Sequence, residues 1–173
     1  NLGLHVEDDP QAVLQNRLAL EKHLSKKVVF MNQTHSDKVI LVDKNDVCEC
    51  EKMLEGKTPV SLGVEADGIV TCDSTVALAV LTADCLPLLM TTKEGNVIAA
   101  VHCGWKGVYS NIIKNAVALI RELSKSEIYV YLGPCIGPES FEVGSELLDK
   151  FQSILPEASR AFTKKGNGKY LCS

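Results

Sequence analysis

The order of apolar and polar residues predicts three helices. The first is predicted from residue 10 to about residue 24, because Asp8 and Asp9 precede a proline at the first helical position, and leucines and valines line one side. The second is predicted over residues 107–123, where isoleucine, valine and alanine recur at helical spacing. The third, also amphipathic, covers residues 143–155.

Short apolar runs predict the strands. Several of these runs contain hardly any polar residue, which is typical of strands buried on both faces of a sheet. The predicted strands are residues 27–31, 38–42, 67–71, 76–82, 87–91, 97–102 and 128–132.

The remaining segments are polar or rich in glycine and proline. We expect residues 32–37 to form a hairpin-like connection, residues 43–65 a loop with a short helix near residues 50–54, and residues 164–173 a loop or sheet edge. Because some strands are joined by short turns, the pattern favours mixed α/β or α+β layering over a doubly wound sheet. A chain of 173 residues without repeats or linkers is most simply one domain.

Composition and charge narrow the class of function. The net charge of −4 argues against broad binding to nucleic acid or to an anionic membrane, and no apolar stretch is long enough for a transmembrane helix. Seven cysteines, an odd number at irregular spacing, argue against a disulfide scaffold and favour a reducing compartment, so we expect the cytoplasm. Cys48 and Cys50 lie in an acidic loop and are interpreted as exposed thiols without a role.

Three residues of metal-ligand type follow or border predicted strands. His35, Cys85 and His102 come from separate segments, and binding sites tend to lie where strands end. Histidine and cysteine are preferred zinc ligands, and three protein ligands with an open fourth position form the catalytic pattern. The alternative from spacing alone is a turn histidine, a packed thiol and a histidine satisfied at a strand end.

Two neighbouring features suggest further roles. Gly104 and Gly107 let the backbone approach a ligand closely, and Lys106 adds a cation where a helix is predicted to start, so these residues are candidates for binding phosphate. Asp84 is a candidate general base or a partner that orients a ligand histidine. Cys85 is alternatively a nucleophile with His35 or His102 as its base.

Six segments, taken together, resemble one family. The chain is similar to the YfiH-like family, also called the laccase-domain or polyphenol-oxidase family, over about residues 1–145. The segments are NLGLHVEDDPQAVLQNR, NQTHSDKV, ADGIVT, LTADCLPLL, AAVHCGWKG and LGPCIGPESFEV.

The resemblance implies a fold and an activity. The implied fold is a layered α/β/β/α arrangement with mixed sheets, formed by residues 1–173 as a single domain that lacks the family's N-terminal and C-terminal segments. The implied activities are phosphorolysis of adenosine, inosine, guanosine and methylthioadenosine, and deamination of adenosine, with purine nucleoside and phosphate as partners. The implied metal ligands are His35, Cys85 and His102, holding Zn²⁺, with Cu²⁺ as the alternative. Lys106 stands where the family usually has arginine, which keeps the charge but loses the bidentate fork.

Three other functions stay open at this point. One is a copper-dependent polyphenol oxidase, which four histidines in the whole chain argue against as a multicopper site. Another is a cysteine hydrolase that uses Cys85. The last is a non-enzymatic module with structural zinc, which needs Cys103 as a fourth ligand although neighbours on a strand point to opposite faces. The sequence indicates no oligomeric state.

Overall fold

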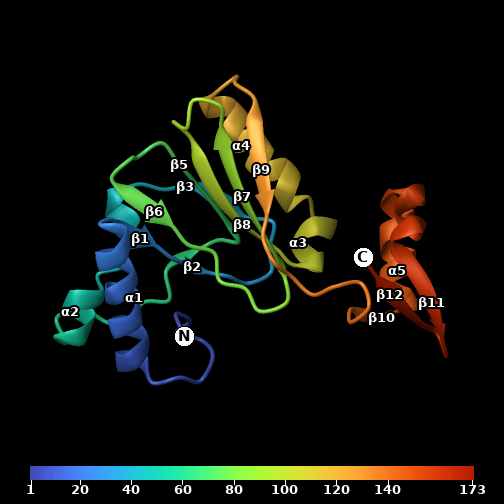
Figure 1. Ribbon diagram of the computed structural model, residues 1–173, viewed down its shortest axis with the longest axis horizontal. Coiled ribbons are helices and arrows are strands. Elements are labelled where there is room, and N and C mark those ends of the chain that lie inside the picture. The colour runs from blue at the N-terminus through green and yellow to red at the C-terminus, as the bar shows by residue number, and fades with distance from the viewer. The chain divides into compact units, whose positions relative to one another are not determined.

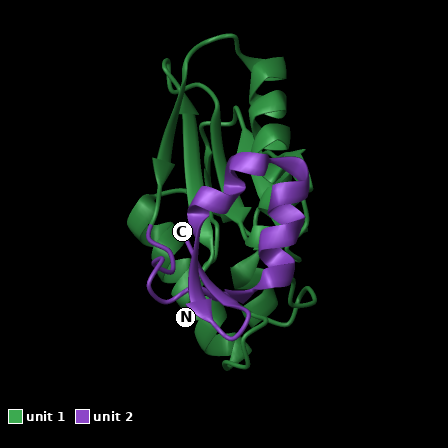
Figure 2. Ribbon diagram, turned by 90° about the vertical axis from the view of Figure 1, so that its right-hand side faces the viewer, with its two compact units in different colours: residues 1–133 green, residues 134–173 purple.

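The computed structural model describes residues 1–173, which form two compact units (Figure 2). The first unit comprises Asn1–Gly133 and the second Pro134–Ser173. All three candidate metal ligands lie in the first unit, so the description of the site concerns that unit alone.

The first unit is built around a five-stranded sheet (Figure 1). Only the β3–β5 pairing is parallel, and the other neighbours run antiparallel. The strands, in sheet order, are β3 (Val39–Leu41), β5 (Gly68–Thr71), β8 (Ile98–Cys103), β7 (Leu86–Thr92) and β9 (Ile128–Leu132). Every residue of β5 is buried, as its largely apolar sequence predicts.

Two small parallel sheets accompany the large one. In the first, β1 (Lys27–Val29) pairs with β6 (Val76–Leu78), and in the second, β2 (Met31–Asn32) pairs with β4 (Val64–Glu65). The predicted strand 27–31 is therefore two short strands with different partners. The prediction of a hairpin-like connection at residues 32–37 is wrong, because β2 and β3 on either side of it belong to different sheets.

The first helices begin and end as predicted. Helix α1 spans Pro10–Leu24, and the side chain of Asp9 accepts a hydrogen bond from the backbone N–H of Gln11. Helix α2 spans Cys50–Leu54, after a short 3₁₀ turn, η1 (Lys44–Asp46).

The predicted helix over residues 107–123 is interrupted at residues 110 and 111, a break that the prediction missed. It is two helices, α3 (Trp105–Tyr109) and α4 (Ile112–Leu123). Between them Asn111 has a φ of 73°, a left-handed conformation that asparagine tolerates better than most residues and that ends α3.

Three clusters of buried side chains hold the layers of the first unit together. Alternation along the central strands divides the first two, because Val70 and Val101 pack on the α4 side while Ile69 and Ala100 pack on the other face, against residues of β1, β2 and β6. The third cluster joins Leu14 of α1 to Val28 and Phe30. The order helix, large sheet, small sheets, helix confirms the α/β/β/α layering with mixed sheets.

The second unit contains a helix and a three-stranded antiparallel sheet. Helix α5 spans Ser145–Ile154 within the predicted range, and is followed by the 3₁₀ helix η2 (Pro156–Ala161). The sheet has the order β10 (Glu142–Gly144), β12 (Lys169–Cys172), β11 (Phe162–Gly166). Residues 164–173 were expected to be a loop or edge. They form most of a hairpin instead, because Gly166, Asn167 and Gly168 all adopt positive φ at its turn.

No helix among residues 1–173 combines the length and apolar character needed to cross a bilayer. All seven cysteines are free thiols.

Two isoleucines of α4 test which face of this helix carries the core. We expect Ile120→Ala to lower the free energy of unfolding by about 2–5 kcal/mol, because Ile120 is fully buried against the large sheet. Ile113→Ala, the same change on the exposed side of the same helix, should cost only a fraction of that. Urea unfolding followed by circular dichroism measures both, and equal losses would show that α4 is packed differently.

Candidate metal centre

His102 reaches the site because of its place on β8. Asp67 lies directly before β5, and its carbonyl oxygen accepts a hydrogen bond of 2.7 Å from the backbone N–H of His102. This bond continues the antiparallel β5–β8 pairing by one residue pair. Strand alternation then places His102 on the same face as Ala100, towards the small sheets, while Cys103 packs in the core beneath α4.

A second contact between the same two residues orients the imidazole. The Oδ1 atom of Asp67 lies 2.8 Å from Nδ1 of His102, and both side chains are buried. Because a carboxylate can only accept, Nδ1 of His102 carries a hydrogen, and Nε2 is the ring nitrogen that remains for a metal. A carboxylate that holds the far nitrogen of a histidine is the usual support for a metal-ligating imidazole.

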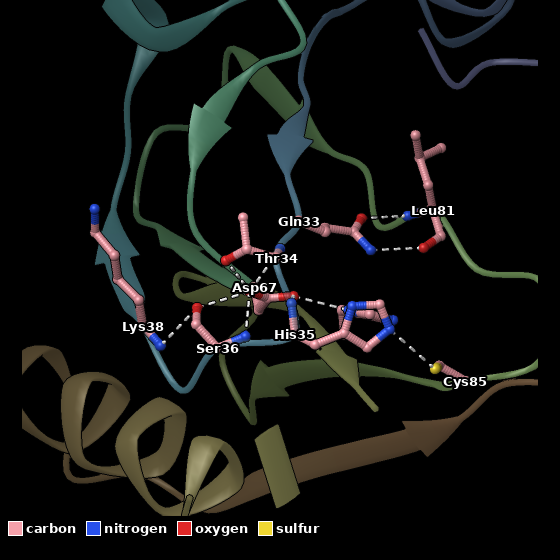
Figure 3. A network of polar contacts seen from close by, with 9 residues as sticks. Gln33, Thr34, His35, Ser36, Lys38, Asp67, Leu81 and Cys85 are labelled. Carbon is pink, nitrogen blue, oxygen red and sulfur yellow. Dashed lines mark hydrogen bonds and ion pairs between the residues drawn. The ribbon is translucent and has the colours of Figure 1, made fainter. Parts of the chain in front are cut away.

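His35 is held by the same carboxylate. Three consecutive backbone N–H groups, those of Thr34, His35 and Ser36, donate to Asp67 at 3.1, 2.9 and 2.7 Å, and the Ser36 hydroxyl adds a fourth bond of 2.7 Å (Figure 3). His35 itself has a φ of 61°, the left-handed conformation in which successive N–H groups converge on an anion. The unusual backbone of the loop is thus compensated by one buried carboxylate.

Cys85 is brought to the site by a pair of hydrogen bonds from Gln33. The amide of Gln33 donates to the carbonyl of Leu81 at 2.7 Å and accepts from its N–H at 2.8 Å, as two backbone groups of paired strands would (Figure 3). This ties the loop before β7, which carries Asp84 and Cys85, to the loop that carries His35. Because Gln33 lies two residues before His35, the two hydrogen bonds hold the loop of Cys85 close to His35.

The three side chains together form one cluster of metal-ligand type. One ligand atom from each of His35, Cys85 and His102 lies within 4.8 Å of the others, and the Sγ of Cys85 is 3.8 Å from Nε2 of His35. The two imidazole rings meet edge to face, with centroids 4.7 Å apart. Two nitrogens and one sulfur suit zinc or another borderline-soft cation, and three ligands leave a position for a substrate. Cys103 is not part of the cluster.

Burial and neighbouring charges set the protonation of these groups. Burial lowers the pKa of His35, and His102 and Lys106 lower it further against the opposing effect of Asp67, so His35 is neutral and able to ligate at neutral pH. Burial, Asp84 and Asp67 all raise the pKa of Cys85, so a bound cation is needed to draw off its proton. Burial alone would raise the pKa of Asp67, but the bonds from His102, Ser36 and Thr34 hold it well below its usual range.

The predicted phosphate-binding residues surround the same cluster. A Cβ on Gly104 would lie 2.8 Å from Cδ2 of His35 and 3.3 Å from Sγ of Cys85, and one on Gly107 would lie 2.8 Å from the carbonyl oxygen of Ser36. Both glycines therefore have a packing reason to lack a side chain. Lys106 is exposed, 5.8 Å from the centroid of the Trp105 ring. Because α3 has only five residues, its start is a weaker anion site than the long helix that the sequence predicted. Phosphate binding by Gly104, Lys106 and Gly107 stays a prediction.

Asp67 and Gln33 are the residues that sequence reasoning missed. Asp67 was interpreted as the first residue of a strand, and the role of orienting a ligand histidine was suggested for Asp84. The structure gives that contact to Asp67, while Asp84 is exposed and stays a candidate acid or base. The sequence does carry a signal for Asp67, which stands directly before a buried and largely apolar strand. A carboxylate at such a place needs hydrogen-bond donors from other parts of the chain.

The family comparison covers the whole chain. A model of the family described as "Multi-copper polyphenol oxidoreductase laccase" matches residues 1–173. A purine nucleoside phosphorylase of Pseudomonas aeruginosa is 34% identical over 99% of this chain and 64% of its own length. Another, of Haemophilus influenzae, is 36% identical over 99% of this chain and 65% of its own length. The chain thus spans slightly less than two thirds of these relatives.

Solved structures show the same fold. A Neisseria meningitidis protein superposes with a TM-score of 0.82 at 36% identity, covering 100% of this chain and 65% of that one. YlmD from Geobacillus stearothermophilus gives a TM-score of 0.85 at 30% identity, covering 100% of this chain and 65% of its own.

Asp67→Asn tests whether this carboxylate positions the ligands. We expect zinc affinity to fall about 10–100-fold, because an amide removes the charge that fixes the His102 tautomer and presents N–H groups to the donors of residues 34–36. Competition with a chromophoric chelator measures the affinity. Asp84→Asn is the matched comparison and should change the affinity far less, because the contact to Nδ1 of His102 comes from Asp67; the reverse ranking would return the orienting role to Asp84.

Gly104→Ala tests the close approach of β8 to the two ligand side chains. The added methyl would press on the His35 ring and the Cys85 sulfur, so we expect weaker zinc binding with the fold retained. Gly137→Ala, where a Cβ meets nothing within 4 Å, controls for the substitution itself. Isothermal titration with zinc distinguishes them, and unchanged affinity in Gly104→Ala would mean that the ligands lie elsewhere.

Proposed function

The chain belongs to the multi-copper polyphenol oxidoreductase laccase family, and from this membership we propose that it is a metal-dependent enzyme acting on purine nucleosides. The observation that carries the proposal is the His35–Cys85–His102 cluster, with His102 oriented by a buried carboxylate. Relatives that align with 99% of the chain are named purine nucleoside phosphorylases. The finer proposal is phosphorolysis of adenosine, inosine, guanosine and methylthioadenosine, and deamination of adenosine.

The donor set fits Zn²⁺, which is the proposed metal. His35, Cys85 and His102 would hold it, and bound there it would act as a Lewis acid that polarises a substrate oxygen or water. Asp67 keeps Nε2 of His102 free for the ion and fixes the His35 loop. Cu²⁺ is the alternative, since it outranks Zn²⁺ in affinity for such ligands.

In the proposed phosphorolysis, phosphate is the attacking anion and the purine base is the leaving group. A phosphate oxygen forms a bond to C1′ of the ribose while the bond from C1′ to the purine nitrogen breaks, and the purine takes up a proton. Lys106 is exposed beside the cluster and is the proposed counter-charge for phosphate, next to the N–H groups that follow Gly104. For deamination, the oxygen of water forms a bond to C6 of adenine while the bond from C6 to the amino nitrogen breaks, and ammonia leaves; Asp84 is proposed to carry the proton from the water to the amino group.

One observation favours a second candidate, a hydrolase with Cys85 as nucleophile. Its Sγ lies 3.8 Å from the His35 imidazole, within reach of a base. Against this, burial and two aspartates raise the pKa of Cys85, which is the opposite of the activation a nucleophilic thiol needs. The copper oxidase alternative needs several metal clusters, and these 173 residues offer one.

The test compares two histidine variants of the zinc-loaded chain. Wild type, His102→Ala and His23→Ala are incubated with adenosine, with and without phosphate, beside the Haemophilus influenzae relative, and the products are separated chromatographically. We expect adenine and ribose-1-phosphate in the presence of phosphate, or inosine without it, from wild type and from His23→Ala, whose histidine is exposed on α1. His102→Ala should lose at least about 100-fold, as expected when a metal ligand or its support is removed.

Two results would contradict the proposal. If adenosine, inosine and methylthioadenosine all remain intact while the relative converts them, this chain does not carry the activity. If His102→Ala retains full activity, the chemistry does not take place at the cluster. Phenol oxidation by the copper-loaded chain in the same preparation would favour the oxidase alternative.

A further inference from the structure

A second cysteine site lies on the opposite side of the small sheets from the metal-type cluster. Cys48 and Cys50, interpreted from the sequence as exposed thiols, are buried, with 7% and 0% of their surface accessible. They belong to the core that joins α1 and α2 to Val28 and Phe30. Their sulfur atoms are 2.8 Å apart, so the pair is in direct contact.

A buried arginine faces this pair. Arg17 of α1 is 1% exposed, and its Nη1 lies 3.5 Å from the sulfur of Cys48. Its Nε donates to the carbonyl of Leu2 at 2.9 Å, and its guanidinium carbon lies 3.9 Å from the centroid of the Phe30 ring. Of these three partners, only the Cys48 sulfur can carry a negative charge, which it does as a thiolate.

The nearby carboxylate is engaged elsewhere. Glu21, one turn further along α1, accepts hydrogen bonds from the Lys27 ammonium at 2.9 Å and from the backbone N–H of Val28 at 3.1 Å. Arg17 takes part in no ion pair with an aspartate or glutamate. A buried charge without a counter-ion is costly, so the Cys48 sulfur is the group placed to balance it. The hydrogen bond from Cys50 and the Arg17 charge outweigh burial and lower the pKa of Cys48, while the pKa of Cys50 is raised.

A cavity is lined by one of the two cysteines. Its volume is about 310 Å³, and Cys48 lines it together with Val47, Met53, Thr58 and Gly63, whereas Cys50 does not. The buried Oγ1 of Thr58 has no hydrogen-bond partner. A small polar molecule fits such a space, and the hydroxyl of Thr58 offers it a hydrogen bond in the cavity that Cys48 also lines.

We propose that Cys48 and Cys50 form a redox-active dithiol that hydrogen peroxide converts to a disulfide. The Cys48 thiolate attacks one peroxide oxygen, forming an S–O bond and breaking the O–O bond, which leaves a sulfenic acid on Cys48 and releases hydroxide. The Cys50 sulfur then forms an S–S bond to Cys48, and the sulfenic oxygen leaves with the Cys50 proton as water. The protein loses two electrons, which reduce the peroxide, and the sulfurs close from 2.8 Å to the roughly 2.05 Å of a disulfide.

The chain offers a direct readout of this reaction. Trypsin cleaves after Lys44 and after Lys52, and the peptide of residues 45–52 contains Cys48, Cys50 and no other cysteine. The reduced full chain is treated with hydrogen peroxide, quenched with catalase, blocked with N-ethylmaleimide and digested. We expect this peptide to be unlabelled and lighter by two hydrogens, and to take up two labels when dithiothreitol precedes the block.

Two variants define the roles of the pair. In Cys50→Ser, Cys48 should gain oxygen, and should be trapped by dimedone as a sulfenic acid, because nothing resolves it. In Cys72→Ser, which removes an exposed thiol outside the cluster, disulfide formation should be unchanged. Arg17→Gln should slow the reaction several-fold and Arg17→Lys less, because the lysine keeps the charge.

Three outcomes would overturn the proposal. In the first, the wild-type peptide keeps both thiols while Cys72 is oxidised. In the second, the wild-type peptide gains oxygen atoms as readily as the same peptide of Cys50→Ser, instead of forming a disulfide. In the third, the disulfide joins one of these residues to another cysteine. If Arg17→Gln does not fold, the wild-type and Cys50→Ser measurements still decide, since neither depends on it.

Discussion

The buried carboxylate of Asp67 is the contact on which the candidate metal centre depends. Removing an ionised carboxylate from water costs several kcal/mol, and charge-assisted hydrogen bonds of about 1.5–3 kcal/mol each offset this only when enough donors converge. Here the donors come from two segments, the backbone of residues 34–36 and the imidazole of His102. Satisfying the charge therefore also fixes where the two histidines meet.

The layered fold provides the surroundings that this contact requires. Alternation along β8 gives Val101 and Cys103 to the core beneath α4 and leaves His102 on the face between the sheets. The short parallel pairing of β2 with β4 ends just before Gln33. The side-chain amide of Gln33 then forms two hydrogen bonds with the backbone of Leu81, in the loop that leads to Cys85. Each ligand thus comes from a strand end or an adjoining loop, and the hydrogen bonds of Asp67 and Gln33 hold these segments together.

The local sequence pattern predicted the first helices and the ligand residues. It did not predict the contacts between residues far apart in the chain. Helix α1 has the predicted bounds because its cap, Asp9 followed by Pro10, is local, and α2 lies where a short helix was predicted. The three ligand residues were identifiable from residue type and position at strand ends. Asp67 was not, because its role depends on donors about 32 residues away. The break at Asn111 and the hairpin at Gly166–Gly168 depend on positive φ angles, which residue type permits but does not require.

The two cysteine sites differ in the sign of the nearest fixed charge, and this separates their chemistry. Burial and the nearby Asp84 and Asp67 favour the protonated thiol of Cys85, so its sulfur becomes an anion when a cation arrives to replace the proton. The hydrogen bond with Cys50 and the permanent charge of Arg17 favour the thiolate of Cys48 without a metal. A cation is therefore the matching ligand for the first site. A peroxide, which reacts with thiolates, is the matching reagent for the second. Residue type alone does not distinguish the two, because in the sequence each is a cysteine next to an acidic residue, and only the fold shows which charge faces its sulfur.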